Sequence, residues 1–262
     1  MKTGSFMLKY LILIAIACSN AHSGEIKLIS YNIGTNLFKS NKKALEKVSE
    51  VIEYYSPTIN IFHNSFNPKS DKLKTNGFHP YFSYSDMVRK RTSTIITSEH
   101  PIINENHKPL KHRLSLWKTY GITHVTLKTG DKEIQLFCLV MPKSKRKVWN
   151  NVLILEKYIK RHAYKGEYLL SIEFDDRPKG DVISYLKKRL DLTDLVEQFA
   201  EENNLDLNKF KTGIVRRKPA RTNILFSSKN SIQILNIYPI FDGTHDENRY
   251  LKDAALYYHI SL

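Results

Sequence analysis

Short runs of strand-type residues follow one another along most of this chain, and this order limits the folds that the chain can adopt. The first run, residues 25–33, begins by alternating, which places Ile26, Leu28, Ser30 and Asn32 on one face. Two packed sheets with helices outside them accommodate such an order, so the sequence predicts an α+β sandwich. Further strand-type runs are 58–63, 81–84, 93–97, 122–127, 134–141, 168–175, 222–227, 232–238 and 257–262, and helical spacing is confined to 41–55, 148–162 and 190–202.

Residues 1–23 have the pattern of a secretory signal peptide. Lys2 and Lys9 are their only Lys, Arg, Asp or Glu residues, the apolar run 10–17 follows, and small residues occupy the cleavage spacing. The run is about half as long as a membrane span, which favours a cleaved signal over a transmembrane anchor. A lipid anchor at Cys18 is the second interpretation. We therefore expect a secreted or periplasmic protein.

The remaining residues, 24–262, are predicted to form a single domain. They are numerous enough for one large core and contain no low-complexity linker. Cys138 is the only cysteine among them, so no intramolecular disulfide can form and the core must supply the stability.

The chain is strongly basic, with a formal net charge of +15. Loss of residues 1–23 leaves 39 of its 41 basic residues against 26 acidic ones, a net charge of +13. Such an excess favours contact with a polyanion, namely nucleic acid, anionic lipid headgroups or acidic glycans, without choosing among them. One basic cluster alone is typical of a solvated surface, whereas four together favour a binding surface. The clusters are Arg89-Lys90-Arg91, Lys143-Ser144-Lys145-Arg146-Lys147, Lys187-Lys188-Arg189 and Arg216-Arg217-Lys218.

Acidic residues, by contrast, gather at the end of the apolar run that starts at Tyr168. Glu173 and Asp175 are two positions apart, so in a strand their side chains project to the same face, and Asp176 begins the following loop. Carboxylate oxygens in this arrangement suit Mg²⁺ or another hard divalent cation. The alternative is a strand end with solvated acids before a turn.

Several segments resemble, in the same order, the endonuclease/exonuclease/phosphatase superfamily, which includes deoxyribonuclease I, abasic-site endonucleases, inositol polyphosphate phosphatases and bacterial sphingomyelinases. Residues 29–33 resemble its opening strand, 57–61 its second strand, and 94–102 a strand and turn that usually end in Ser-x-x-Pro-Ile. Residues 117–122 are similar to the sphingomyelinase-like branch in particular. The resemblance covers most of the mature chain. It implies a deoxyribonuclease I-like four-layered β-sandwich flanked by helices.

The resemblance also implies metal-assisted hydrolysis of a phosphodiester or phosphomonoester, in which Mg²⁺ stabilises the phosphoryl charge and a His-Asp pair activates water. Matched position by position, Asn32 keeps the family's first-strand Asn. The metal-binding Glu after the second strand becomes Asn64, which supplies an oxygen but no charge. Glu173 and Asp175 stand in the family's Gly-Asp-Phe-Asn motif and keep oxygen ligands with altered length and charge.

The catalytic positions match less well. A phosphate-binding His is replaced by Val140, and the Asp that orients the general base by Asn223, whereas His259 keeps the His of Ser-Asp-His. An Asn in place of an orienting Asp can hold the wrong imidazole tautomer, which in serine proteases costs about 10⁴ in rate. We therefore expect a catalytically degenerate member that binds an anionic partner. The alternative is an active metal-dependent phosphodiesterase, of nuclease or sphingomyelinase type, with an altered metal site.

Overall fold

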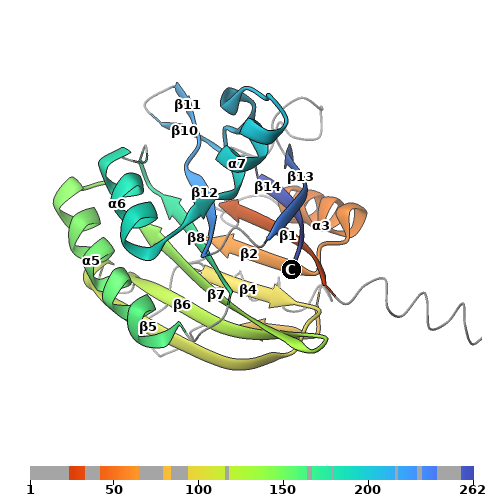
Figure 1. Ribbon diagram of the computed structural model, residues 1–262, viewed down its shortest axis with the longest axis horizontal. Helices are drawn as coiled ribbons and strands as arrows, with labels where there is room; N and C mark the ends of the chain where they lie inside the picture. Colours follow the sequence, from red (N-terminus) through yellow and green to blue (C-terminus); the bar gives the residue numbers. More distant parts are fainter. Residues whose placement is uncertain are drawn as a thin grey trace, which may run out of the picture.

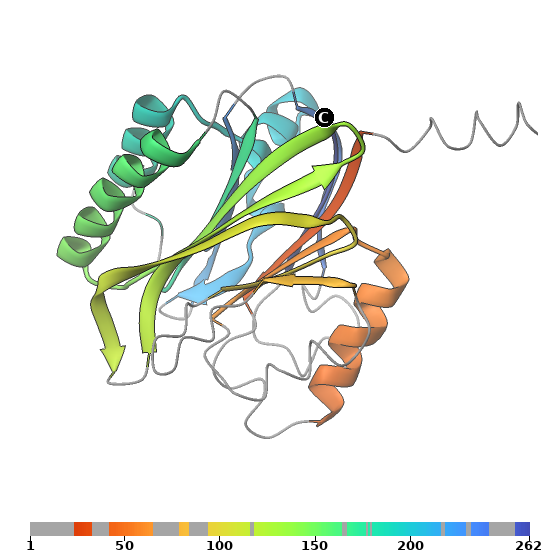
Figure 2. The same cartoon turned by 90° about the horizontal axis from the view of Figure 1, so that it is seen from below.

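Two six-stranded sheets pack face to face, as the sequence predicts (Figures 1 and 2). This computed structural model describes residues 24–32, 42–64, 79–83, 94–115, 118–163, 167–176, 178, 180–215, 218–228, 232–240 and 255–262. The strand order is β13-β14-β1-β2-β4-β3 in the first sheet and β5-β6-β7-β8-β12-β9 in the second, and β10 pairs with β11 separately.

The first sheet consists of β13 (Gln233–Ile240), β14 (Ala255–Ser261), β1 (Glu25–Asn32), β2 (Ile59–His63), β4 (Thr94–Ser98) and β3 (Tyr81–Ser83). The second consists of β5 (Ile102–Ser115), β6 (Lys118–Thr129), β7 (Lys132–Met141), β8 (Tyr168–Phe174), β12 (Asn223–Ser227) and β9 (Thr193–Asp194). The other elements are α3 (Lys42–Tyr55), α5 (Lys145–His162), α6 (Gly180–Leu190), α7 (Leu195–Glu202), the 3₁₀ helix η2 (Leu207–Phe210), β10 (Gly213–Val215) and β11 (Lys218–Ala220).

Three hydrophobic cores separate four layers, in the order helix, sheet, sheet, helix (Figure 2). The first core lies between the sheets, the second between the β5–β9 sheet and helices α5 and α6, and the third between the β13–β3 sheet and α3. This is the predicted deoxyribonuclease I-like sandwich. The central strands β2, β4, β8 and β12 are buried along their whole length, so most of their side chains on both faces are apolar.

Strand alternation decides which side chains lie between the sheets. In β1, Leu28 belongs to the inner core, whereas Ile29 and Tyr31 belong to the core beneath α3. In β8, Leu169 faces inward and Leu170 faces α5 and α6. Because side chains alternate with a period of two, the polar residues at the ends of β1 and β8 are also directed between the sheets.

Several elements differ from the sequence-based assignment. Residues 102–115, which were not predicted as a strand, form the 14-residue edge strand β5, whose polar residues and Pro109 hid it. The helix predicted over 190–202 is confirmed only as α7, which starts after Asp194, whose side chain accepts N–H bonds from its first turn. Residue 190 instead ends α6, a helix that was not predicted, and the chain turns at Asp191, which has φ 52°. β10 and β11 were not predicted.

The predicted signal peptide lies outside the described residues. None of the helices in the described ranges is long and apolar enough to span a membrane. Cys138 lies fully buried in the inner core as a free thiol, and burial raises its pKa well above the ordinary value.

Candidate functional site

The predicted metal residues come together at one end of the sandwich. β1 and β2 are parallel neighbours, so their carboxyl ends meet, with Asn32 ending β1 and Asn64 directly after β2. In the opposite sheet, Glu173 of β8 pairs in register with Asn223 of β12. The backbone at Asn64 has φ 59°, in the left-handed region that Asn tolerates better than most residues.

Glu173 is fully buried at the centre of this group and is held by amides. Asn32 Nδ2 donates to Glu173 Oε1 and Asn223 Nδ2 donates to Glu173 Oε2, each at 3.0 Å. Asn64 Nδ2 donates in turn to Asn32 Oδ1, also at 3.0 Å. Both oxygens of the carboxylate therefore accept hydrogen bonds, as a buried charge requires. We call Glu173, Asn32, Asn64 and Asn223 the amide cage.

Asp175 lies beside the amide cage, just beyond the end of β8. The Tyr120 hydroxyl donates to Asp175 Oδ2 at 2.6 Å. Burial raises the pKa of the Asp175 carboxyl, and this shift is opposed by the hydrogen bond from Tyr120, the charge of Lys143 and a hydrogen bond from Asn64. Burial, and secondly Asp175, raise the pKa of Tyr120, so its hydroxyl stays protonated as the donor.

A second polar layer lies deeper between the sheets. His63 Nε2 lies 2.8 Å from Ser171 Oγ and His63 Nδ1 lies 3.3 Å from Thr94 Oγ1, and Ser171 Oγ lies 3.2 Å from Ser30 Oγ. Burial lowers the pKa of His63 to about 3, so the ring is neutral at neutral pH. All four side chains are fully buried. Their role is to satisfy one another, because substrate cannot reach them.

His259, predicted as the catalytic base, does not join the cluster. It pairs with Lys27 across β1 and β14, five residues from Asn32, which corresponds to about 17 Å along a strand. Its Nε2 instead lies 3.0 Å from Glu25 Oε2. His259 therefore lies toward the end of β14 that is remote from the amide cage, and its role as a base stays a prediction. The end of β14 beside the amide cage is its beginning, at Ala255.

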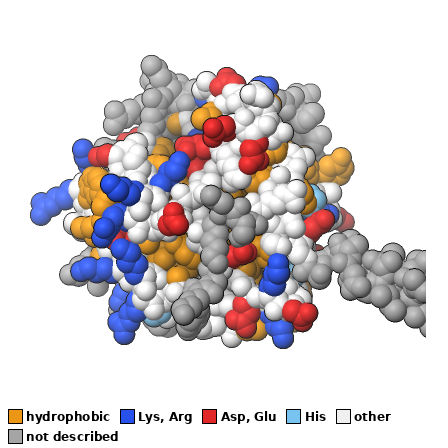
Figure 3. All heavy atoms as spheres, viewed as in Figure 1, with side chains coloured by type: hydrophobic (Ala, Val, Ile, Leu, Met, Phe, Trp, Pro, Cys, Tyr) orange, Lys and Arg blue, Asp and Glu red, His pale blue; other side chains and the backbone are white. Residues whose placement is uncertain are grey.

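The basic clusters differ in their surroundings. Residues 143–147 are exposed, and this segment leads from β7 into α5 next to the site, because Asp175 N donates to Met141 O at 3.0 Å. Lys and Arg side chains gather over α5 and α6 in Figure 3. On α6, Lys187 is bonded to Glu197 and Arg189 to Glu156. The predicted contacts Arg89, Lys90, Arg91, Arg216 and Arg217 lie outside the described residues.

The side chains present do not fit the charged metal centre that the resemblance implies. Only Glu173 and Asp175 carry negative charge in the cluster, and both oxygens of Glu173 are already occupied by amide N–H groups. Among the described residues, no group of three or more His, Cys, Asp and Glu side chains is placed to hold a metal ion. The buried Asn223 Oδ1 has no hydrogen-bond partner among the described residues and could act as a metal ligand, but it is neutral and adds no charge.

Sequence reasoning placed Ser30 on the face of Asn32 but missed four other contributors to this end of the sandwich. Tyr120 orients Asp175 from a different strand, and His63, Thr94 and Ser171 form the deeper layer with Ser30. The available signal was polarity on an otherwise apolar inward face. His63 follows Ile59 and Ile61 with a period of two, and Ser171 interrupts an apolar run.

No protein-family model and no curated protein sequence matches this chain. Its fold is that of the endonuclease/exonuclease/phosphatase superfamily, as comparison with solved structures shows. The chain is similar to TDP2 of D. rerio, solved in complex with a single-strand DNA product, with a TM-score of 0.72 and 11% identity over 91% of this chain and 99% of that one.

Two bacterial structures are comparably similar. An endonuclease/exonuclease/phosphatase protein of Bacteroides vulgatus gives a TM-score of 0.71 at 10% identity, covering 91% of this chain and 99% of that one. The mannosyl-6-phosphatase of Bacteroides thetaiotaomicron gives 0.69 at 12% identity, covering 90% of this chain and all of the other. The likeness establishes the fold. The sphingomyelinase-like branch stays a prediction.

Proposed function

We propose that this chain is a non-hydrolytic member of its fold class that binds a phosphate-rich polyanion at the basic edge of the site. The observation that carries the proposal is the occupation of both Glu173 oxygens by Asn32 and Asn223. A carboxylate satisfied by neutral amides does not need a cation. Amides at Asn64 and Asn223, where the family resemblance implies acids, point the same way.

The binding surface is the exposed segment 143–147 beside Asp175, which we call the basic rim. Lys143 is close enough to influence the pKa of Asp175. Lys145 is 3.5 Å from Asp181, whereas Arg146 and Lys147 have no ion pair with any described residue. The basic residues in the first turn of α5 lie at the positive end of the helix dipole, and this turn contains no acidic residue. Their repulsion from the dipole is unfavourable, and a bound anion would offset it.

Single-stranded nucleic acid is the partner we propose. The solved structure of zebrafish TDP2 holds a single-strand DNA product on the same fold. The net charge of +13 left after the predicted cleavage favours a long polyanion over a small one, because every neutralised phosphate releases a counterion. We further propose that the protein is secreted, so that its partner is extracellular or periplasmic.

Fluorescence anisotropy with a labelled oligothymidylate tests this function. We expect binding that weakens steeply with salt, and a loss of about tenfold or more in affinity for the double variant Arg146→Glu/Lys147→Glu. The matched control is Lys157→Glu/Arg161→Glu, which makes the same charge change on exposed positions farther along α5. Its affinity should stay within about twofold of the parent.

Salt-insensitive binding, or equal losses in the two double variants, contradicts the assignment of the basic rim. Vesicles containing anionic lipid form a second arm of the same titration. If they bind tightly while the oligonucleotide does not, the partner class is wrong.

A metal-dependent phosphodiesterase is the competing function, and the convergence of Asn32, Asn64, Glu173, Asp175 and Asn223 favours it. It requires that the amides release Glu173. Hydrolysis of oligonucleotide or sphingomyelin that needs Mg²⁺ and disappears in Glu173→Ala identifies this function instead.

A further inference from the structure

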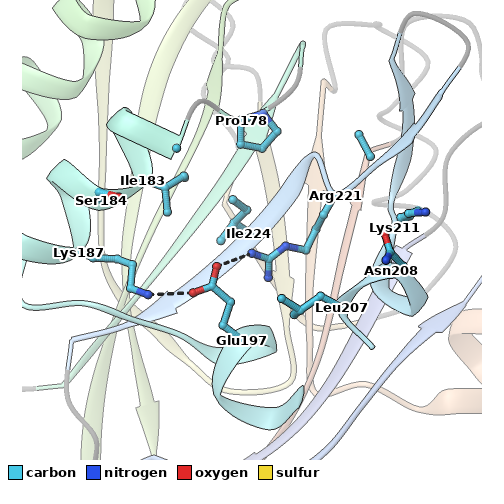
Figure 4. A pocket seen from close by; sticks show the side chains of 12 residues that line it. Pro178, Ile183, Ser184, Lys187, Glu197, Leu207, Asn208, Lys211, Arg221 and Ile224 are labelled. Atoms are coloured by element: carbon cyan, nitrogen blue, oxygen red, sulfur yellow. Dashed lines mark hydrogen bonds and ion pairs between the residues drawn. The ribbon is translucent and has the colours of Figure 1, made fainter. Parts of the chain in front are cut away.

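A hollow lies away from the amide cage, between α6 on one side and α7 with η2 on the other (Figure 4). Its volume is about 620 Å³. Ile224 of β12 lines it from the outer face of the sheet, whereas the preceding Asn223 is directed between the sheets. Strand alternation therefore separates the two sites. We call this hollow the α6–α7 pocket.

A chain of ion pairs crosses the α6–α7 pocket (Figure 4). Glu197 lies between two cations, with Lys187 Nζ at 2.8 Å from its Oε2 and Arg221 Nη2 at 3.3 Å from its Oε1. Arg221 also donates from Nη1 and Nη2 to the two oxygens of Asp194, at 2.8 and 2.6 Å. Asp194 is fully buried and accepts N–H bonds from the start of α7. The pocket thus already binds a carboxylate, that of Glu197, between two cationic side chains.

The pocket retains one positive charge beyond these pairs. Lys211 lines the wall beside Asn208 and has no ion pair with any described residue. Lys187, Lys211 and Arg221 together outnumber Asp194 and Glu197 by one. A ligand with a single negative charge balances this set, whereas a dianion overcompensates.

Apolar side chains form the rest of the lining. Ile183 of α6, Leu207 of η2 and Pro178 face the pocket together with Ile224. Leu207 is 46% exposed, which is unusual for a leucine and leaves apolar area for a ligand to cover. The volume lies within the range of small-molecule sites, about 300–1,000 Å³.

We propose that the α6–α7 pocket binds a small organic monocarboxylate, with its carboxylate at Lys211 and its apolar body against Ile183 and Leu207. We choose a carboxylate ligand over a phosphate for two reasons. The pocket has a single surplus positive charge, and its Lys187 and Arg221 already bind the carboxylate of Glu197. This site is independent of the polyanion surface, and either proposal can fail without the other.

Calorimetry and saturation-transfer NMR with 3-phenylpropionate test the proposal. We expect a Kd of order 1–10 mM, and binding at least about tenfold weaker for the neutral 3-phenylpropionamide, which lacks the charge that Lys211 pairs with. Ser184→Trp, which fills the mouth of the pocket from α6, and Lys211→Ala should each weaken binding of the carboxylate to a similar extent.

Matched controls use neighbours that do not line the pocket. Lys188→Trp places the same ring at an exposed position one turn farther along α6, outside the lining of the pocket, and Lys209→Ala removes a lysine of η2. Neither should change the affinity by more than about twofold. Equal binding of the amide, unchanged affinity in Ser184→Trp and Lys211→Ala, absence of binding, or tighter binding of inorganic phosphate than of the carboxylate would each overturn the proposal.

Discussion

Glu173 is the residue on which the account of the site depends. Its carboxylate is buried and satisfied by two amide donors. Such a carboxylate costs desolvation energy that the amides offset only while all members are present. The side chains of the amide cage therefore depend on one another. Replacing the Glu173 carboxylate by a neutral amide should then affect stability differently from removing the side chain.

We expect Glu173→Gln to change the free energy of unfolding by about 1 kcal/mol or less, because Asn223 can turn its unpartnered Oδ1 toward the new amide. Glu173→Ala should cost about 2–4 kcal/mol, since it removes the acceptor of the buried Asn223 amide and of the half-buried Asn32 amide. Urea unfolding measures both values. A Gln variant as unstable as the Ala variant would show that the charge itself is needed.

His63 makes stability dependent on pH. Burial lowers its pKa to about 3 in the folded protein, below the ordinary value of 6.5. The unfolded chain therefore binds more protons between these values, and the contribution is fully present above about pH 6.5 and is lost as pH falls toward 3. We expect this contribution to reach about 3–5 kcal/mol.

The variant His63→Gln should flatten the decline of the unfolding free energy between pH 7 and pH 4. His124, whose pKa burial lowers to about 4, provides the comparison, and in His124→Gln the decline due to His63 should persist. A parent protein whose stability does not fall on acidification argues against a neutral buried His63.

Much of the residue-scale pattern could be predicted from alternation. It placed Ser30 and Asn32 on one face of the first strand, and Glu173 and Asp175 on one face of the strand that became β8. It could not give the partners across the sheets, because pairing between distant segments depends on tertiary packing. His259 shows the same limit, since a motif shifted by a few residues along β14 moves a side chain to the other end of the sandwich.

At the scale of elements, α5 carries basic residues in both its first and its last turn. Its first turn carries Lys145, Arg146 and Lys147, where the positive end of the helix dipole disfavours cations. Its last turn carries Lys160, Arg161 and His162, where cations are favourable. The stability of the helix therefore explains the basic residues of the last turn but not those of the first turn.

The double variant Arg146→Glu/Lys147→Glu should consequently be more stable than the parent by about 0.5–1.5 kcal/mol, although it binds the oligonucleotide less well. Thermal unfolding at low salt measures the gain. A variant that loses both stability and binding indicates that the basic rim is structural.

Elements with strong periodicity were the predictable ones. α3 and the β6–β7 hairpin follow their sequence patterns closely. β5 was missed because an edge strand exposes polar residues on much of its length, and α6 was missed although Val182, Leu186 and Leu190 recur at helical spacing. Both elements are stabilised by packing against segments that are distant in the sequence, and the sequence pattern alone does not show these contacts.

At the scale of the whole molecule, the space between the sheets becomes more polar toward one end. Apolar pairs such as Leu28 and Leu169 give way to Ser30 and Ser171, and then to Asn32 and Glu173. The four-layered fold thus has a polar end between its sheets, and amide side chains occupy much of it. We propose that these amides take the place of a metal ion there.

Isothermal titration of the folded chain with Mn²⁺ tests this claim most directly. We predict no heat of binding at the amide cage up to about millimolar Mn²⁺, and titration curves for the parent and for Glu173→Gln that superimpose. One-to-one binding in the parent that disappears in Glu173→Gln would contradict it.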